Sequence, residues 1–193
     1  MSNNFFIPGS DDKFQGFLFK DNLDEALHWD DTYAPILRAH FGKPFGNQYV
    51  PFQIIPNPDD KRRRKKIDCD RLENIFLLSK HAVNTIGDLL APHGQFLEIN
   101  CPLTGYIAFH TTTVIKDGVI WEKTKYEDGI GINGPYRVIR GEPVLKAEKV
   151  SNRNIFMLAE NIASFYISQA VKDRIEEAGL KGFLFENSPI IAI

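Results

Sequence analysis

The chain has 193 residues, of which 43% are hydrophobic and 25% charged, and its formal net charge is −2. This length can bury one well-formed core, and the charge balance does not indicate a surface built for nucleic acid or acidic membranes. No apolar run approaches the roughly 20 residues of a membrane-spanning helix, and the opening residues MSNNFFIPGSDD do not resemble a signal peptide. With only Cys69 and Cys101 present, we expect free thiols and a cytoplasmic protein without membrane contact.

Residues 1–66 are expected to form an irregular region, rich in proline and aromatic residues, that packs on the rest. Phe14–Lys20 predicts a strand, and Asp21–Trp29 predicts a short helix with an N-terminal cap. Five prolines from Pro35 to Pro58 favour an extended loop. Aromatic residues lie among these prolines, so we expect the loop to be packed down rather than disordered.

The segment Asp59–Lys66, DDKRRRKK, is the strongest run of charge in the chain. Its cationic part, Lys61–Lys66, is able to contact phosphates. However, aspartates flank it on both sides and no aromatic residues alternate with it, so we interpret it as a solvated loop. Nucleic acid is therefore an unfavoured partner.

Two segments, Ile75–Asn100 and Ala163–Asn187, repeat one pattern of apolar stretch, serine, amphipathic stretch, glycine and apolar stretch. Ser79 and Ser168 are predicted helix N-caps, and Gly179 is predicted to end the second helix in a left-handed conformation. We interpret the repeat as a duplicated strand–helix–strand unit. Each helix has one apolar stripe, so both helices should lie on the same side of one sheet.

The middle of the chain is rich in strand signals. Tyr106–Ile115 and Gly118–Lys123 predict strands joined in a hairpin at Lys116–Gly118. Tyr126–Arg137 contains three glycines and a proline and predicts a surface loop. Together these patterns predict a single α+β domain over residues 1–193, with a mixed β-sheet and a duplicated core at 67–187.

Motifs of catalysis are not apparent. The five histidines form no zinc-binding spacing, and neither cysteine has a second cysteine nearby. Cys69 lies between two aspartates, which should raise its pKa. Gly129, Gly131 and Gly134 match a loose dinucleotide-binding spacing, but Pro135 follows instead of a helix. We therefore predict no catalytic residues, no metal site and no cofactor.

The C-terminal copy resembles a known family. IFML at 155–158, FYIS at 165–168, EEAGLKG at 176–182 and FLF at 183–185 are similar to the closing segment of an immunity-protein family of bacterial polymorphic toxin systems, formerly a domain of unknown function. Tyr106–Tyr126 is similar to the middle of that family, so the resemblance covers about residues 70–187. It implies a protein that binds and neutralises a cognate toxin domain encoded nearby, and it carries over no catalytic residues.

Aromatic and acidic residues in and beside the predicted loop are the candidate contacts with such a partner, and the acids would suit a basic toxin surface: Glu122, Tyr126, Glu127, Asp128 and Tyr136. A second candidate region is Phe41–Phe52, whose aromatic residues are equally compatible with burial. The alternative function is a small enzyme with a dispersed pocket around His110, with Glu98 or Glu122 as its carboxylate. The sequence also leaves a homo-oligomer open.

Overall fold

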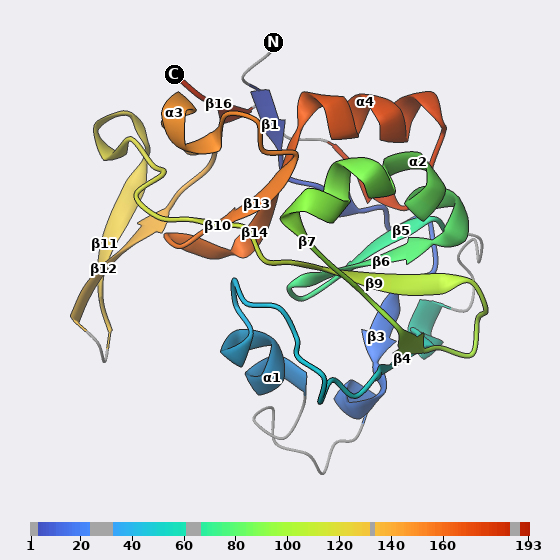
Figure 1. Ribbon diagram of the computed structural model, residues 1–193. Coiled ribbons are helices and arrows are strands. Elements are labelled where there is room, and N and C mark those ends of the chain that lie inside the picture. Colours follow the sequence, from blue (N-terminus) through green and yellow to red (C-terminus); the bar gives the residue numbers. More distant parts are fainter. Residues whose placement is uncertain (1–3, 24–32, 61–66, 132–133, 186–189) are drawn as a thin grey trace.

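The computed structural model describes residues 4–23, 33–60, 67–131, 134–185 and 190–193 (Figure 1). Most of the helix expected over Asp21–Trp29, and the basic run Lys61–Lys66, lie outside these ranges. Among the described helices none is long and apolar enough to cross a membrane. The fold is α+β, as predicted, but its strands form several separate sheets rather than one.

Two sheets make up the centre of the molecule. The four-stranded sheet is antiparallel and has the order β5 (Cys69–Leu72), β6 (Ile75–Ser79), β9 (Tyr106–Thr111), β7 (Gly94–Leu97). The five-stranded sheet has the order β10 (Val114–Ile115), β13 (Ile155–Leu158), β14 (Asn161–Ser168), β1 (Asn4–Phe6), β16 (Ile190–Ile191). Its strands are antiparallel except for the parallel pair β10 and β13.

The prediction of a hairpin at Lys116–Gly118 is wrong. After β10 the chain turns, and Trp121–Lys123 forms a 3-10 helix, η5, instead of a strand. β10 instead pairs in parallel with β13, with Val114 opposite Met157. This pairing joins residues more than forty positions apart, which local turn signals cannot indicate.

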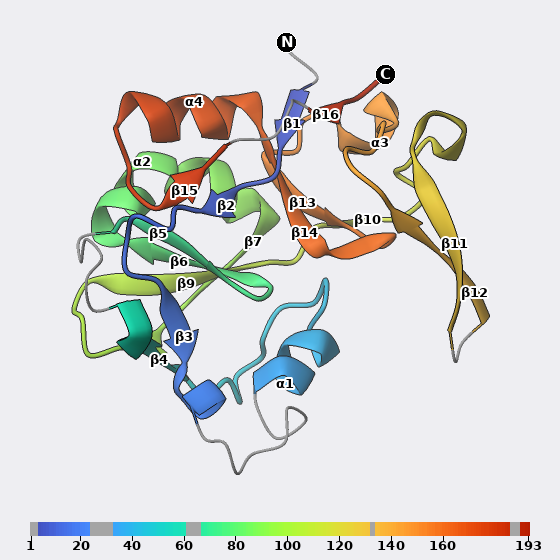
Figure 2. The same cartoon turned by 180° about the vertical axis from the view of Figure 1, so that it is seen from behind.

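The two predicted helices are present and lie side by side on one core. Helix α2 (Lys80–Leu90) and helix α4 (Gln169–Glu177) run next to each other in both views (Figures 1 and 2). Ser79 caps α2 by accepting the Ala82 N–H at 3.1 Å, and Ser168 caps α4 by accepting the Val171 N–H at 3.4 Å. One apolar cluster contains the buried faces of both helices and of strands from both central sheets.

Helix α4 ends as the sequence predicts. Gly179 has a φ of +62°, which is unfavourable for other residues. Its N–H donates to the Glu176 carbonyl at 3.0 Å, and the Leu180 N–H donates to the Ile175 carbonyl at 3.0 Å. Leu180 and Ile175 are both buried in the same cluster. These are the two hydrogen bonds and the apolar contact of a Schellman motif.

The duplicated unit begins one strand earlier than the sequence pattern indicates. In the first copy β5 and β6 form a hairpin that leads into α2, and in the second copy β13 and β14 form a hairpin that leads into α4. The strands that follow the helices differ, because β7 joins the four-stranded sheet while β15 (Phe183–Leu184) pairs with β2 (Gly9–Ser10) and with no other described strand. The repeated unit is therefore strand–strand–helix.

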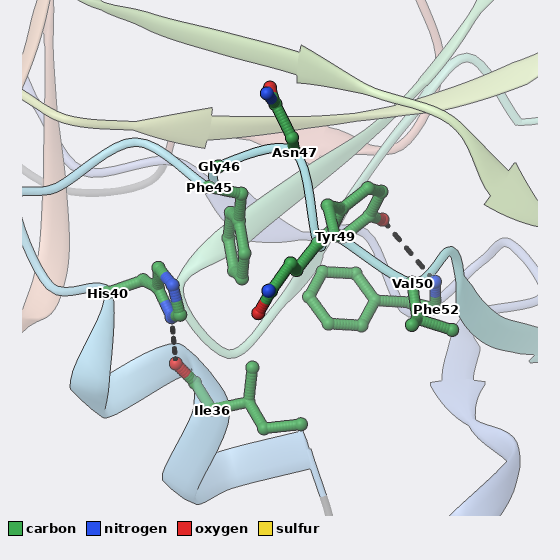
Figure 3. A pocket seen from close by; sticks show the side chains of 9 residues that line it. Ile36, His40, Phe45, Gly46, Asn47, Tyr49, Val50 and Phe52 are labelled. Carbon is green, nitrogen blue, oxygen red and sulfur yellow. Dashed lines mark hydrogen bonds between the residues drawn. The ribbon is translucent and has the colours of Figure 1, made fainter.

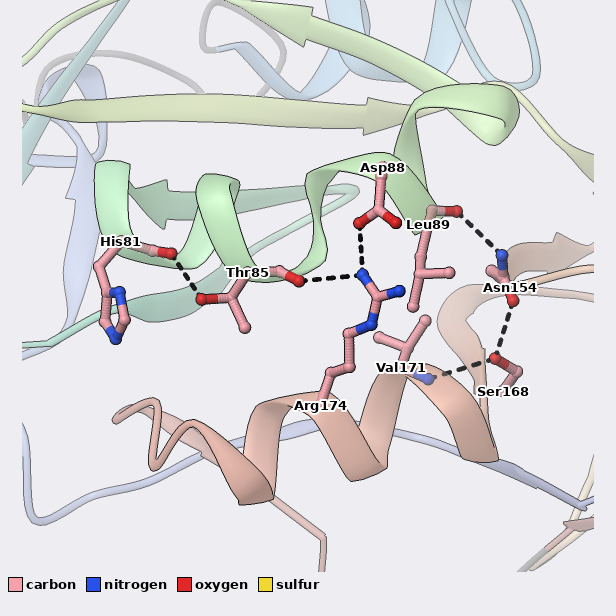
Figure 4. A network of polar contacts seen from close by, with 8 residues as sticks. All are labelled: His81, Thr85, Asp88, Leu89, Asn154, Ser168, Val171 and Arg174. Carbon is pink, nitrogen blue, oxygen red and sulfur yellow. Dashed lines mark hydrogen bonds and ion pairs between the residues drawn. The ribbon is translucent and has the colours of Figure 1, made fainter.

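In each copy, a polar residue just ahead of the strand hairpin forms a hydrogen bond with the other copy. Asp68 accepts the hydroxyl of Ser79 at 2.8 Å and the Lys181 N–H, just beyond α4, at 3.1 Å. Asn154 accepts the hydroxyl of Ser168 at 3.1 Å and donates to the Leu89 carbonyl, near the end of α2, at 3.2 Å (Figure 4). Each copy thus holds the C-terminal end of the other copy's helix.

A second polar contact joins the helices directly. Arg174 on α4 donates to the Thr85 carbonyl at 3.2 Å and to the Asp88 carboxylate at 2.5 Å, both on α2 (Figure 4). The hydrogen bond from Arg174 to the Asp88 carboxylate is the main cause of the lowered pKa of Asp88. The contact lies at the exposed edge of the helix pair, where ion pairs contribute little to stability.

The N-terminal region is more regular than expected. Helix α1 (Tyr33–Ala39) contains Pro35 in its first turn, where a helix leaves its N–H groups unbonded and tolerates proline. β3 (Phe17–Phe19), β4 (Phe52–Pro56) and β8 (Ile99–Asn100) form a three-stranded sheet. Phe45 and Phe52 are buried with this sheet in a second apolar cluster, which confirms that the segment packs down.

The remaining elements are short. They comprise η1 (Lys20–Leu23), η3 (Pro58–Asp60), η4 (Ala91–His93), η5 (Trp121–Lys123), α3 (Ala147–Val150), β11 (Tyr126–Gly131) and β12 (Gly134–Ile139). β11 and β12 form a sheet of their own, which contains four of the five candidate contact residues.

Candidate functional site

The segment predicted as a glycine-rich loop is an antiparallel hairpin. β11 and β12 pair from Tyr126 opposite Ile139 to Gly131 opposite Gly134. They pair with no other strand in the described part of the chain, and they stand apart at the edge of the molecule in both views (Figures 1 and 2). The loop prediction was wrong because glycines weaken a strand signal, although strands accept glycine where another group lies close.

One glycine of β11 has such a close neighbour. Gly129 is opposite Tyr136, and a Cβ at Gly129 would come within 2.6 Å of the Tyr136 ring. The Tyr136 ring therefore lies across the bare backbone of Gly129. A tyrosine over a cross-strand glycine covers backbone that would otherwise be open to water.

The face of the hairpin that carries Tyr126 is a cluster of aromatic rings and one cation. Trp121 and Tyr126 contact edge to face, with their ring centroids 5.3 Å apart. The Arg137 guanidinium lies 5.1 Å from the Trp121 ring centroid. The guanidinium lies 4.6 Å from the Tyr126 ring centroid. Cation–π contacts of this kind contribute about 0.5–1 kcal/mol at exposed sites. They fix Arg137 over the rings.

The acidic residues of the hairpin already have partners on it. Glu127 pairs with Arg140 at 2.6 Å, and Asp128 pairs with Arg137 at 3.6 Å. Residues 121–140 contain four lysines and arginines against three acids. The hairpin is thus not an acidic patch, and the expectation that its acids attract a basic toxin surface loses its electrostatic basis.

Apolar side chains of the hairpin remain in water. Ile130 is 91% exposed, Tyr136 52% and Tyr126 36%. A shallow cavity of about 360 Å³ lies beside them, lined by Trp121, Asp128, Pro135, Tyr136 and Arg137. Exposed aromatic and aliphatic side chains next to a hollow are features of protein-binding surfaces.

The base of the hairpin is fixed to the core. Thr124 is buried, and its hydroxyl accepts the Val144 N–H at 2.9 Å. The Arg140 N–H donates to the Lys125 carbonyl at 2.9 Å, which closes the ladder below Tyr126. Ile139 and Trp121 pack against the third apolar cluster. A base fixed to the core and exposed side chains at Ile130 and Tyr136 make the hairpin an arm that presents these side chains in a defined position.

The structure brings four of the five predicted contact residues together. Tyr126, Glu127, Asp128 and Tyr136 lie on the paired strands. Glu122 lies in η5, exposed, ahead of β11. Sequence reasoning missed Arg137, Ile130 and Trp121, although the alternation of β11 and β12 places Arg137 and Ile130 on the face of Tyr126.

His110 is fully buried in β9. Its Nε2 donates to the carbonyls of His40 at 3.0 Å and Lys43 at 3.1 Å, so this nitrogen carries a proton and is engaged with backbone. Burial lowers the pKa of His110, against the raising effect of these carbonyls. Glu98 and Glu122, the carboxylates considered with it, are both exposed. These contacts give His110 a role in holding the segment 40–43.

The two cysteines are free thiols, one buried and one half-buried. Cys69 is fully buried, and this burial is the main cause that raises the pKa of its thiol. The nearby carboxylates of Asp68 and Asp70 raise it further. Burial raises the pKa of the half-buried Cys101 as well. Within the described ranges no group of three or more histidine, cysteine, aspartate and glutamate residues is placed to hold a metal ion.

Comparison with protein-family models and with curated proteins gives no match for this sequence.

Proposed function

We propose that this chain is a cytoplasmic immunity protein that neutralises a cognate bacterial toxin domain by binding it, with the β11–β12 hairpin as its contact arm. The observation that carries the proposal is the exposure of Ile130, Tyr136 and Tyr126 on a hairpin that no other described strand covers. Solvated side chains of this type release water when a partner covers them, and tyrosine is enriched among residues that dominate binding energy. The sequence resemblance supplies the class of partner.

The hairpin also offers its partner a free backbone edge. β11 and β12 each have one side without a described strand partner, so a strand of the toxin domain can extend the ribbon by main-chain hydrogen bonds. The paired charges Glu127–Arg140 and Asp128–Arg137 leave the arm close to neutral. We therefore expect a partner surface dominated by apolar and main-chain contacts, with a total buried area of about 1,600 Å².

The test is co-expression with the toxin domain encoded beside the gene, with growth as the readout. The wild type should restore growth and form a complex that survives size-exclusion chromatography. Ile130→Asp should weaken the complex at least about tenfold without changing the unfolding free energy, because the side chain is 91% exposed. The control is Ile162→Asp, the same change at an exposed residue of β14.

Four outcomes decide the proposal. Loss of rescue with Ile130→Asp but not with Ile162→Asp supports the arm. Equal rescue by both variants would show that the contact with the toxin lies outside the hairpin. A wild type that neither binds nor rescues ends the immunity proposal, and a dimer of the wild type that Ile130→Asp dissociates would assign the hairpin to self-association.

A further inference from the structure

A pocket of about 500 Å³ lies between helix α1 and the segment 45–52 (Figure 3). Helix α1 lies apart from the hairpin arm (Figure 1). Its walls include Ile36 and His40 from the end of α1 and Phe45, Tyr49 and Phe52 from the following segment. Figure 3 shows these five side chains around one open space. The volume lies within the range of small-molecule sites in proteins.

The aromatic walls of the pocket are packed against one another. The His40 imidazole stacks on the Phe45 ring with centroids 4.1 Å apart and an interplanar angle of 14°. Phe45, Tyr49 and Phe52 contact each other edge to face, with centroids between 5.2 and 5.6 Å apart. Rings that support each other in this way cannot collapse into the open space without losing these contacts.

Polar groups of β7 and the residue after it fix the same segment. The Gln95 side chain accepts the Phe45 N–H at 2.9 Å and donates to the Phe45 carbonyl at 3.2 Å, and so it pairs with the backbone as a neighbouring strand would. The Tyr49 hydroxyl donates to the Glu98 carbonyl at 2.8 Å. The central sheet thereby holds Phe45 and Tyr49, two of the aromatic residues of the pocket wall, in position.

The buried His110 fixes the remaining wall. Its Nε2 donates to the carbonyls of His40 and Lys43, while the His40 Nδ1 lies 2.9 Å from the Ile36 carbonyl. Since a carbonyl only accepts, the His40 Nδ1 donates this hydrogen bond to the Ile36 carbonyl. The Gln95 and His110 side chains and the Glu98 carbonyl therefore hold an exposed pocket in a preformed shape, which lowers the entropy cost of binding.

We propose that this pocket binds a small, neutral aromatic molecule that carries a hydrogen-bonding group. Its rings favour a planar apolar ligand, and Val50 at 72% exposure and Ile36 at 44% have apolar surface that such a ligand would remove from water. Asn47 and Gln48 also line the pocket and supply amide donors and acceptors. None of the nine lining residues is an acid, a lysine or an arginine, so a charged ligand would lose hydration without a counter-charge.

The test uses indole as the probe, followed by backbone amide shifts in two-dimensional NMR. Saturable shifts should be confined to residues 36–52, with a Kd of about 1 mM or tighter for a ligand of this size. Indole-3-acetate, which adds a negative charge, should bind about tenfold more weakly. Val50→Asp should weaken indole binding about tenfold without unfolding the protein, whereas Ile162→Asp should leave it unchanged.

Several results would overturn the proposal. These are shifts that do not saturate by about 10 mM indole, shifts spread over the hairpin as well as residues 36–52, or unchanged affinity in Val50→Asp. A short tryptophan-containing peptide that binds more than about tenfold tighter than indole would assign the pocket to a protein side chain instead. Since the probe is tested on the chain alone, the result does not depend on a toxin partner.

Discussion

Asn154 is the residue at which the packing of the two copies is most directly testable. Asn154→Ala removes the hydrogen bond from its amide to the Leu89 carbonyl and the one from the Ser168 hydroxyl to its carbonyl oxygen. Each such bond contributes about 0.5–1.5 kcal/mol net, so the free energy of unfolding should fall by about 1–3 kcal/mol. The backbone bond from the Asn154 N–H to His93 Nε2, 3.1 Å long, is retained.

Urea unfolding followed by circular dichroism measures this loss. With an m-value of about 2 kcal/mol per molar urea, the midpoint should move down by about 0.5–1.5 M at unchanged m. Asn154→Asp keeps the acceptor for Ser168 but places an oxygen against the Leu89 carbonyl, so it should cost at least as much as alanine. The control is Asn100→Ala, the same change at an exposed residue of β8.

A loss below about 0.5 kcal/mol in Asn154→Ala, or no difference from Asn100→Ala, would refute the reasoning. It would mean that Asn154 does not hold the end of α2, and that only the apolar cluster joins the two copies.

Three further predictions follow from single residues. Ser168→Ala should lower the unfolding free energy by about 1 kcal/mol in urea titrations and leave partner binding intact; abolished binding in a folded variant would contradict a purely capping role. Burial holds the pKa of Asp70 above its ordinary value, so its contribution to stability should fall as pH rises from about 3.9 through that pKa. Asp70→Asn should remove this fall, and parallel pH profiles of the two proteins would show the reasoning to be wrong. Gly182 has a φ of +116°, and a Cβ there would come 1.8 Å from the Cys69 carbonyl oxygen, so Gly182→Ala should cost more than about 3 kcal/mol. Gly141→Ala, with a φ of +89° and no atom nearby, should cost only about 1–2 kcal/mol; equal losses by thermal melting would exclude the close approach as the cause.

The sequence predicts best where structure depends on neighbouring residues. Ser79 and Ser168 bond to N–H groups three residues away, and Gly179 ends its own helix, so local patterns identify both helices. The partner of β10 lies more than forty residues away, and the register of Tyr126 with Ile139 belongs to glycine-containing strands, which specify register weakly. The repeat boundary was missed for the same reason, because the contacts of Asp68 and Asn154 with the opposite copy have no local signature.

The candidate arm shows the same limit. Tyr126 and Tyr136 were recognisable as candidates from their residue type, but the neutralisation of Glu127 and Asp128 was not. That neutralisation depends on which residue of β12 lies opposite each residue of β11, and glycine-rich strands specify register weakly. Similarly, the polar bonds that Gln95, Glu98 and His110 make with the pocket walls connect residues 49 or more positions apart.

β1 lies between β14 and β16, with Phe5 opposite Ser168 on one side and Ile190 on the other. The ribosome makes Phe5 and Phe6 more than 150 residues before their strand partners in β14 and β16. Until these partners have been made, the two phenylalanines lack the strands that cover them in the finished sheet, a state in which nascent chains bind chaperones or aggregate. Synthesis of β14 and β16, rather than the emergence of either helix alone, is the event that permits the five-stranded sheet to close.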